Sequence, residues 1–329
     1  MKLVIPIPCL NEESTLRATL DLLPKAIPGI DAIEVVVVDD GSTDDTSRVA
    51  REWGVAEVVR FRANRGLARA FMAGIEASLR RGADIIVNTD ADNQYPGEAI
   101  ERLVRPIVDG RADVVVGDRG VGKVPHFSPA KRLLQRIGSW VVRLASGTRL
   151  PDVTSGFRAF SREAALRLNV LSDFTYTLET IIQVGTDRLA IDHVAIEANR
   201  TERPSRLFRG TLEYLRRSGQ TIARVYTMYR PLRTFLYLAT LFALMGLGAT
   251  GRFVYFYVRD PDYSGHIQSL VLGAACLIIS FQVLLFGLLA DLVGANRKLL
   301  EETLRRLRRL ELERPAVRQA SLHDPEDRE

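Results

Sequence analysis

Two long apolar stretches in the last third of the chain set the strongest limit on how it folds. Residues 234–251 contain no charged side chain, and residues 267–290 form a second uncharged stretch. Each is close to the roughly 20 apolar residues that a helix needs to cross about 30 Å of hydrocarbon. A pair of buried core helices is the alternative, but two such runs in succession favour membrane spans at 232–258 and 267–291, joined by an extracytoplasmic loop at 259–266.

The cations around these stretches predict their orientation, because short cytoplasmic flanks of membrane spans are enriched in Lys and Arg. The flanking cations are Arg206, Arg209, Arg216, Arg217, Arg224, Arg230 and Arg233 before the first span, and Arg297, Lys298, Arg305, Arg306, Arg308 and Arg309 after the second. The connecting loop sets Arg259 against two aspartates. We therefore expect a protein of the cytoplasmic membrane with both termini and a domain of residues 1–205 in the cytoplasm.

Three segments next to the spans are also interpretable. Residues 206–231 place aromatic and aliphatic side chains on one helical face and arginines on another, which is typical of a helix lying in the lipid headgroup layer; packing against its own domain is the alternative. Residues 292–314 read as a charged cytoplasmic helix whose leucines are compatible with contact between two copies of the chain. Residues 315–329 read as a disordered tail. Since the basic residues gather beside the spans, we expect no nucleic-acid binding.

The N-terminal part alternates short apolar runs with segments of helical period, a pattern that predicts a mostly parallel sheet flanked by helices. The expected strands cover residues 3–7, 33–38, 57–61, 84–88, 113–116 and 156–160. The expected helices cover residues 11–23, 44–53, 67–80 and 97–108. Continuous runs such as EVVVV indicate strands buried on both faces. Ligands of such sheets bind at the carboxyl ends of the strands.

Three strand ends carry polar residues. After the fourth strand, Asp90, Asp92 and Gln94 alternate, so in an extended segment their oxygens would share one side. Carboxylate and amide oxygens suit Mg²⁺ or Mn²⁺, and Mg²⁺ usually binds jointly through one or two carboxylates and substrate phosphates. An acidic surface loop is the alternative. Asp39 and Asp40, after the second strand, are explained equally well by turn and helix-cap chemistry or by function.

The motifs IPCLNEE, VVVVDDGSTDDT, NRG, VNTDADNQYP, VVGDR and SGFRAFSRE occur in an order and spacing that resemble family 2 glycosyltransferases of the GT-A fold. With two spans after this domain, the chain most resembles the polyprenyl-phosphate glycosyltransferases, which include dolichol-phosphate mannose synthases and undecaprenyl-phosphate glucosyltransferases. The resemblance implies a nucleotide-sugar donor, a polyprenyl-phosphate acceptor and Mg²⁺ or Mn²⁺.

The resemblance also implies roles for individual residues. It assigns nucleotide binding to Pro8, Glu12, Asp39, Asp40 and Asp90. It assigns binding of the metal and the diphosphate to Asp90, Asp92 and Gln94, and it makes Asp92 catalytic as well. The remaining catalytic positions are Arg119, Arg158 and Glu179. Binding of the acceptor phosphate is assigned to Arg119, Lys131, Arg132 and Arg206. Arg206 lies in RTERPSRLF, where it replaces the lysine of dolichol-phosphate mannose synthases.

The implied reaction is a direct displacement that inverts the anomeric centre, because a polyprenyl phosphate is already anionic and needs no strong base. The enzyme mainly positions the reactants and neutralises charge on the departing diphosphate. Three other functions stay open. A processive polysaccharide synthase would want more spans and a Gln-x-x-Arg-Trp motif, a nucleotidyltransferase would need a Gly-rich triphosphate loop, and a membrane scaffold would bind a nucleotide sugar without catalysis.

Overall fold

The computed structural model describes residues 1–120, 147–148, 150–170, 176–197, 199, 227, 231–259 and 266–313. These residues divide into two compact units. The first contains the described residues up to Asn199 together with 301–313, and the second contains those from 227 to 300. The first unit is an α/β domain, and the second is a pair of long helices.

The α/β unit is built on one seven-stranded sheet in the order β3-β2-β1-β4-β6-β5-β7. Its strands are β1 (Lys2–Cys9), β2 (Ala32–Asp39), β3 (Glu57–Arg60), β4 (Ile85–Asn88), β5 (Val114–Asp118), β6 (Arg158–Ser161) and β7 (Ile191–Ala195). β6 pairs antiparallel with β4 and β5, whereas the other neighbours pair in parallel. The expected mostly parallel α/β sheet is confirmed.

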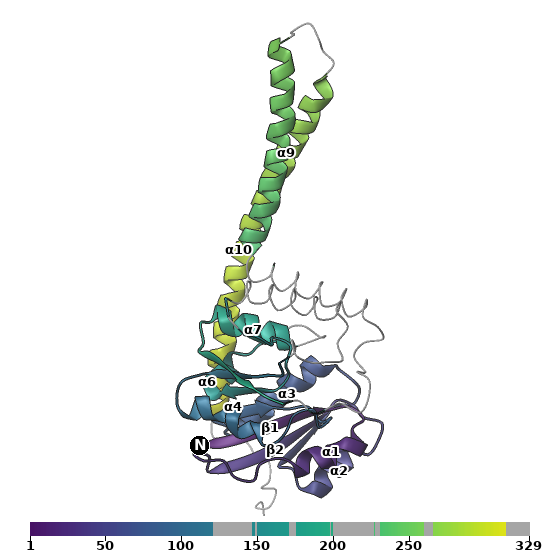
Figure 1. The fold of residues 1–329 in the computed structure, drawn as a ribbon, viewed down its shortest axis with the longest axis vertical. Coiled ribbons are helices and arrows are strands. Elements are labelled where there is room, and N and C mark those ends of the chain that lie inside the picture. Colours follow the sequence, from purple (N-terminus) through teal and green to yellow (C-terminus); the bar gives the residue numbers. More distant parts are fainter. Residues whose placement is uncertain are drawn as a thin grey trace, which may run out of the picture. The chain divides into compact units, whose positions relative to one another are not determined.

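Helices cover both faces of this sheet (Figure 1). In β1, Leu3 and Ile5 point to one face and Val4 to the other, as the two-residue period of a strand requires. The first face is covered by α1 (Glu13–Asp21), α2 (Thr46–Trp53) and α4 (Ala99–Val108). The second is covered by α3 (Leu67–Arg80), α6 (Arg162–Arg167) and α7 (Thr177–Thr186). This double burial explains the continuous Val and Ile runs of the central strands.

The first six strands and first four helices lie where the sequence predicts them, within about two residues at most ends. β7, α6 and α7 were not predicted. The antiparallel course of β6 was not predicted either, because strand direction depends on pairing rather than on local periodicity.

The second unit contains α9 (Pro231–Arg259) and most of α10 (Ile267–Glu313), two helices long and apolar enough to cross a membrane. Only 11% and 17% of their most apolar windows are buried, whereas the core helices of a soluble protein are mostly buried. They pack through small residues: a Cβ on Gly246 would lie 2.8 Å from Leu277, and one on Gly287 would lie 2.7 Å from Phe235. Ser280 donates to the Ala239 carbonyl at 2.8 Å. Small residues at the contact are typical of membrane helix pairs.

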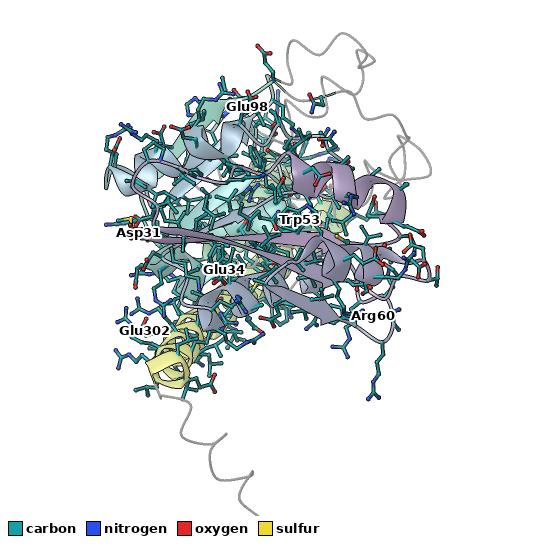
Figure 2. The ribbon with its side chains drawn as sticks, turned by 90° about the horizontal axis from the view of Figure 1, so that it is seen from below. Asp31, Glu34, Trp53, Arg60, Glu98 and Glu302 are labelled. Carbon is teal, nitrogen blue, oxygen red and sulfur yellow. The ribbon has the colours of Figure 1, made fainter. Side chains whose placement is uncertain are left out.

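α10 differs from the expected division into a span and a separate charged helix, because it continues as one helix of 47 residues. Its last turns belong to the α/β unit (Figure 2, yellow helix with Glu302). There Arg305 and Arg309 pair with Glu163 at 3.1 and 2.9 Å, and Arg308 donates to the Leu168 carbonyl at 2.7 Å. One face of this segment therefore packs on its own domain. Of the expected loop 259–266 the structure describes only Arg259 and His266, and the expected tail 315–329 lies outside the described residues.

Candidate functional site

The carboxyl ends of β1, β2 and β4 meet at one edge of the sheet. Cys9 lies opposite Asp39 in the ladder between β1 and β2, and the Asp40 amide donates to the Cys9 carbonyl at 2.9 Å. β4 pairs with β1 on its other side and ends two residues before Asp90. Pro8, Asp39, Asp40 and Asp90, four of the predicted nucleotide contacts, therefore emerge from adjacent strands.

The Asp39 carboxylate is fully buried and has three protein partners. One oxygen accepts the Ser42 amide at 2.7 Å, and the other accepts the Ser47 hydroxyl and pairs with Arg60 at 3.4 Å. Arg60 also donates to the Ser42 carbonyl at 3.1 Å. Of these partners only Arg60 is half exposed, and Figure 2 shows it at the rim of the domain. Arg60 is therefore the one of these three partners that lies open to solvent.

Asp40 holds the backbone that leads into α3. Its two oxygens accept the amides of Arg65 and Gly66 at 2.7 and 2.9 Å. Gly41 has a φ of +78°, and a Cβ there would lie 2.5 Å from the Ala63 carbonyl carbon, so the position requires glycine. The carboxylate of Asp40 therefore fixes a loop that lies 25 residues further along the chain, just before α3.

Glu12 lies on the loop that follows β1. Asn11 before it takes a left-handed φ of 55°, which asparagine tolerates better than most residues. The Glu12 amide donates to the Thr46 hydroxyl at 2.8 Å, and its carboxylate accepts the Thr15 hydroxyl at 2.7 Å. These contacts fix the Glu12 side chain close enough to Asp90 for the two carboxylates to repel each other.

The segment after β4 is a turn. It is not the extended chain that would place the oxygens of Asp90, Asp92 and Gln94 on one side. Asn93 has a left-handed φ of 57°, and the Gln94 amide donates to Asp92 Oδ1 at 3.1 Å. Local side-chain to backbone bonding of this kind ends a strand. Asp90 and Asp92 are nevertheless close enough for their charges to interact, so the turn still brings the two carboxylates together.

The pKa of the Asp90 carboxyl is raised to about 7, from an ordinary value of 3.8. Burial is the main cause, and repulsion from Asp92 and then from Glu12 adds to it, while Arg119 acts in the opposite direction. A buried excess of negative charge at the end of a central strand marks a position that a cation would neutralise.

A network of buried residues, joined by hydrogen bonds and ring stacking, lies beside Asp90. The Asn88 amide group donates to the Gly156 carbonyl at 3.0 Å and to the Tyr176 hydroxyl at 2.9 Å. The Tyr176 ring stacks on Phe71 with centroids 3.9 Å apart. A Cβ on Gly156 would lie 2.7 Å from the Tyr176 hydroxyl and 3.3 Å from Asp90 Oδ2. No larger residue fits between the tyrosine and the carboxylate.

Arg119 follows β5 and is held by Asp152. Its Nε and Nη2 donate to the two Asp152 oxygens at 2.8 and 3.2 Å, and Nη2 also donates to the Thr154 hydroxyl at 2.9 Å. Burial alone would raise the pKa of Asp152, but Arg119 and the bonds from Thr154 lower it. Arg119 is therefore a fixed cation whose charge reaches Asp90.

Arg158 and Glu179 are buried rather than open to a pocket. The Arg158 guanidinium donates to the carbonyls of Val153, Ser155 and Thr177 at 2.8–2.9 Å, and burial lowers its pKa to about 10. Arg158 thus ties the loop before β6 to α7. Glu179, on α7, is 1% exposed, so its side chain does not lie on the surface of that helix.

Three predicted cations, Lys131, Arg132 and Arg206, lie outside the described residues, as does nearly all of the expected interface helix 206–231.

The described residues suit a divalent ion that a ligand helps to hold. Within them, no group of three or more His, Cys, Asp or Glu side chains forms a metal site. Asp90, Asp92 and Gln94 offer oxygen donors on one short turn, and the pKa of Asp90 is raised first by burial and then by repulsion from Asp92 and Glu12. Two carboxylates that need further ligands from a phosphate are a usual arrangement for Mg²⁺ or Mn²⁺.

Comparison with known proteins agrees with this geometry. Residues 4–168 match the model of the family described as glycosyl transferase family 2. The chain belongs to this family. It is 32% identical to an undecaprenyl-phosphate mannosyltransferase of Micrococcus luteus, over 62% of this chain and 85% of that protein. It is 31% identical to a polyprenol monophosphomannose synthase of Mycolicibacterium smegmatis, over 51% of this chain and 64% of that protein.

The GT-A-type fold of this family 2 glycosyltransferase has solved counterparts. One is a glucosyl-3-phosphoglycerate synthase of Mycobacterium tuberculosis, determined with Mn²⁺, uridine diphosphate and glucosyl-3-phosphoglycerate. It aligns with a TM-score of 0.53 at 23% identity, over 69% of this chain and 78% of that one. At this identity the likeness concerns the fold alone, and it confirms the sheet predicted from the strand pattern.

Several residues that shape the glycosyltransferase site were not singled out from the sequence. They are Asn88, Asp152, Gly156, Tyr176 and Asn199. Asp152 and Gly156 had a signal, because they lie in PDVTSGFR, within and just before a motif that carried the resemblance. Asn88, Tyr176 and Asn199 act through contacts with distant parts of the chain, which no local pattern reveals.

Proposed function

We propose that this glycosyltransferase moves a single sugar from a UDP- or GDP-sugar to a polyprenyl phosphate at the cytoplasmic face of the membrane. The donor is inferred from the acidic sheet edge and the family. The lipid acceptor is inferred from the two apolar helices and from relatives whose names state undecaprenyl or polyprenol carriers. The cytoplasmic orientation is inferred from the cations that flank the helices.

The observation that carries the proposal is the acidic turn of Asp90, Asp92 and Gln94 at the carboxyl edge of the sheet. It stands in the same chain as two helices able to enter a membrane. Neither a soluble acceptor nor a nucleic acid requires such helices.

The residues divide into donor and acceptor roles in this proposal. Pro8, Glu12, Asp39 and Asp40 shape the nucleotide end of the site. Mg²⁺ or Mn²⁺, held by the acidic turn, would supply charge neutralisation to the diphosphate.

On the acceptor side, Arg119 orients the lipid phosphate, a task that Asp152 supports by fixing the guanidinium. Lys131, Arg132 and Arg206 are proposed to share this task. The phosphate oxygen attacks the anomeric carbon as the bond to the diphosphate oxygen breaks, so configuration inverts and no protein base is required. Arg158 and Glu179, both buried, are proposed to position the acceptor side through α7 rather than to contact the reacting atoms.

The test is a transfer assay on full-length protein in detergent. Radiolabelled UDP- and GDP-sugars are offered with undecaprenyl or dolichyl phosphate and Mg²⁺ or Mn²⁺, and lipid products are extracted into organic solvent. We expect one labelled lipid from one donor, lost on adding EDTA. A long polymer would instead establish a polysaccharide synthase, a new nucleotide sugar a nucleotidyltransferase, and nucleotide binding without any product a scaffold.

A further inference from the structure

The turn that follows β4 needs support from outside itself. Asn93 adopts a left-handed backbone conformation, which costs free energy for any residue with a side chain. Asn93 Oδ1 is buried and has no hydrogen-bond partner among the described residues, and an unsatisfied buried acceptor adds to this cost. The internal bond from the Gln94 amide to Asp92 fixes only one end of the turn. Contacts with other elements must therefore hold the turn in shape.

Two residues supply those contacts. Thr19, buried on α1, donates its hydroxyl to the Ala91 carbonyl at 3.0 Å. Asn199 binds the other half: its amide donates to the Gln94 carbonyl at 2.9 Å and its side-chain Nδ2 to the Asn93 carbonyl at 3.0 Å. Asn199 thus donates hydrogen bonds to two consecutive carbonyls of a turn that lies 106 residues before it in the sequence.

Asn199 is itself anchored to the sheet. Three residues earlier, the Ile196 amide extends the β5–β7 ladder by donating to the Asp118 carbonyl at 2.8 Å, and the Ile196 side chain is buried in the core. Arg102 of α4 donates to the Ala195 carbonyl at 3.3 Å. The end of β7, three residues before Asn199, is therefore fixed to the sheet and to α4.

We propose that Asn199 is a positioning residue for the metal-binding turn, which holds the carbonyls of Asn93 and Gln94 so that Asp92 and Gln94 face the ion together. This inference rests on the proposed role of that turn in metal and diphosphate binding. Asn199 touches neither ion nor substrate in this scheme, and its effect passes through the backbone of the turn.

The test compares full-length wild-type protein with Asn199→Ala, which removes the side-chain donor but keeps the backbone bond. The matched control is Arg102→Ala, which removes a hydrogen bond to the same end of β7 without touching the turn. Hydrogen–deuterium exchange of peptides covering residues 89–99, in metal-free buffer, reports the turn directly. We expect exchange at least two-fold faster in Asn199→Ala and unchanged in Arg102→Ala.

The second readout is Mn²⁺ affinity, measured by electron paramagnetic resonance with UDP and, separately, GDP present. Loss of one net hydrogen bond predicts a dissociation constant about five-fold higher in Asn199→Ala and within two-fold of wild type in Arg102→Ala. Unchanged exchange of the turn, or unchanged Mn²⁺ affinity, in Asn199→Ala would overturn the inference. If wild-type protein binds no Mn²⁺ with either nucleotide, the proposed metal role fails, and with it the functional meaning of the Asn199 contact, even where the exchange data confirm the contact itself.

Discussion

Replacing Asp90 with asparagine should make the protein more stable and inactive at the same time. The pKa of Asp90 lies at about 7 in the folded protein, chiefly because the group is buried, against 3.8 for a free side chain. A raised folded-state pKa means that the fold favours the protonated acid. The resulting stabilisation is complete below pH 3.8 and is lost as the pH rises through 7. Above pH 7 the folded protein therefore contains an ionised Asp90 carboxylate that lowers the free energy of unfolding.

The size of this cost follows from the shift. About three pKa units at about 1.4 kcal/mol each set an upper limit near 4 kcal/mol. Because Asp90 retains some solvent contact, we expect roughly half of that, about 2 kcal/mol. For a domain of this size, 2 kcal/mol corresponds to a rise in melting temperature of about 4–8 °C.

The asparagine amide cannot ionise, so Asp90→Asn should melt above wild type at pH 8 and close to it at pH 4. The assay is thermal unfolding of full-length protein in detergent with EDTA, followed by tryptophan fluorescence, with Trp53 as a reporter inside the α/β unit. Adding Mn²⁺ with nucleotide should raise the melting temperature of wild type and leave that of the variant unchanged.

Asp152→Asn is the matched control, for which we expect a change in melting temperature of the opposite sign. The pKa of Asp152 is lowered because its contacts with Arg119 and Thr154 outweigh the effect of burial, so its charge stabilises the fold above pH 3.8 and this stabilisation is lost as the pH falls. This variant should melt below wild type at pH 8. If Asp90→Asn melts at or below wild type at pH 8 in EDTA, the carboxylate is not held at a cost and the reasoning is refuted.

Three further predictions concern the site and the end of α10. Asp92→Ala should abolish transfer while the protein still inserts in membranes and melts normally; near-normal turnover would remove the metal role from this residue. Gly156→Ala places a Cβ 2.7 Å from the Tyr176 hydroxyl, so we expect a loss of about 1–3 kcal/mol of stability and at least ten-fold in transfer rate, and wild-type kinetics would show that the contact relaxes freely. Glu163→Lys sets a like charge among the arginines of α10 and should lower stability by about 1–2 kcal/mol in denaturant unfolding. Glu302→Lys, whose ion pairs with Arg305 and Arg306 lie within α10 alone, serves as the comparison.

The sequence predicted the strand ends well because buried parallel strands leave a strong local signal. The run EVVVV identifies β2, and the polar residues that follow β1, β2 and β4 converge as expected once those strands pair. The turn at Asp90 was less accessible, since the left-handed conformation of Asn93 replaces the extended chain that alternation suggested.

Side-chain partners were the least predictable part of the site. The resemblance implied catalytic roles for Arg158 and Glu179, but it did not indicate that both side chains are buried where α7 packs on the second face of the sheet. Asn88 and Tyr176 meet across 88 residues of sequence. Such pairs depend on the finished fold, because residue type and spacing specify neither the neighbour across the sheet nor its distance.

The division of α10 between the two units has a consequence for the order of events during synthesis. The α/β unit is discontinuous in the chain, with the apolar hairpin inserted between its main part and residues 301–313. A ribosome delivers residues in order, and domains generally begin folding before synthesis ends. The hairpin is therefore synthesised before the arginines that contact Glu163 and Leu168, so the last contacts of the α/β unit form only after both apolar helices have been made.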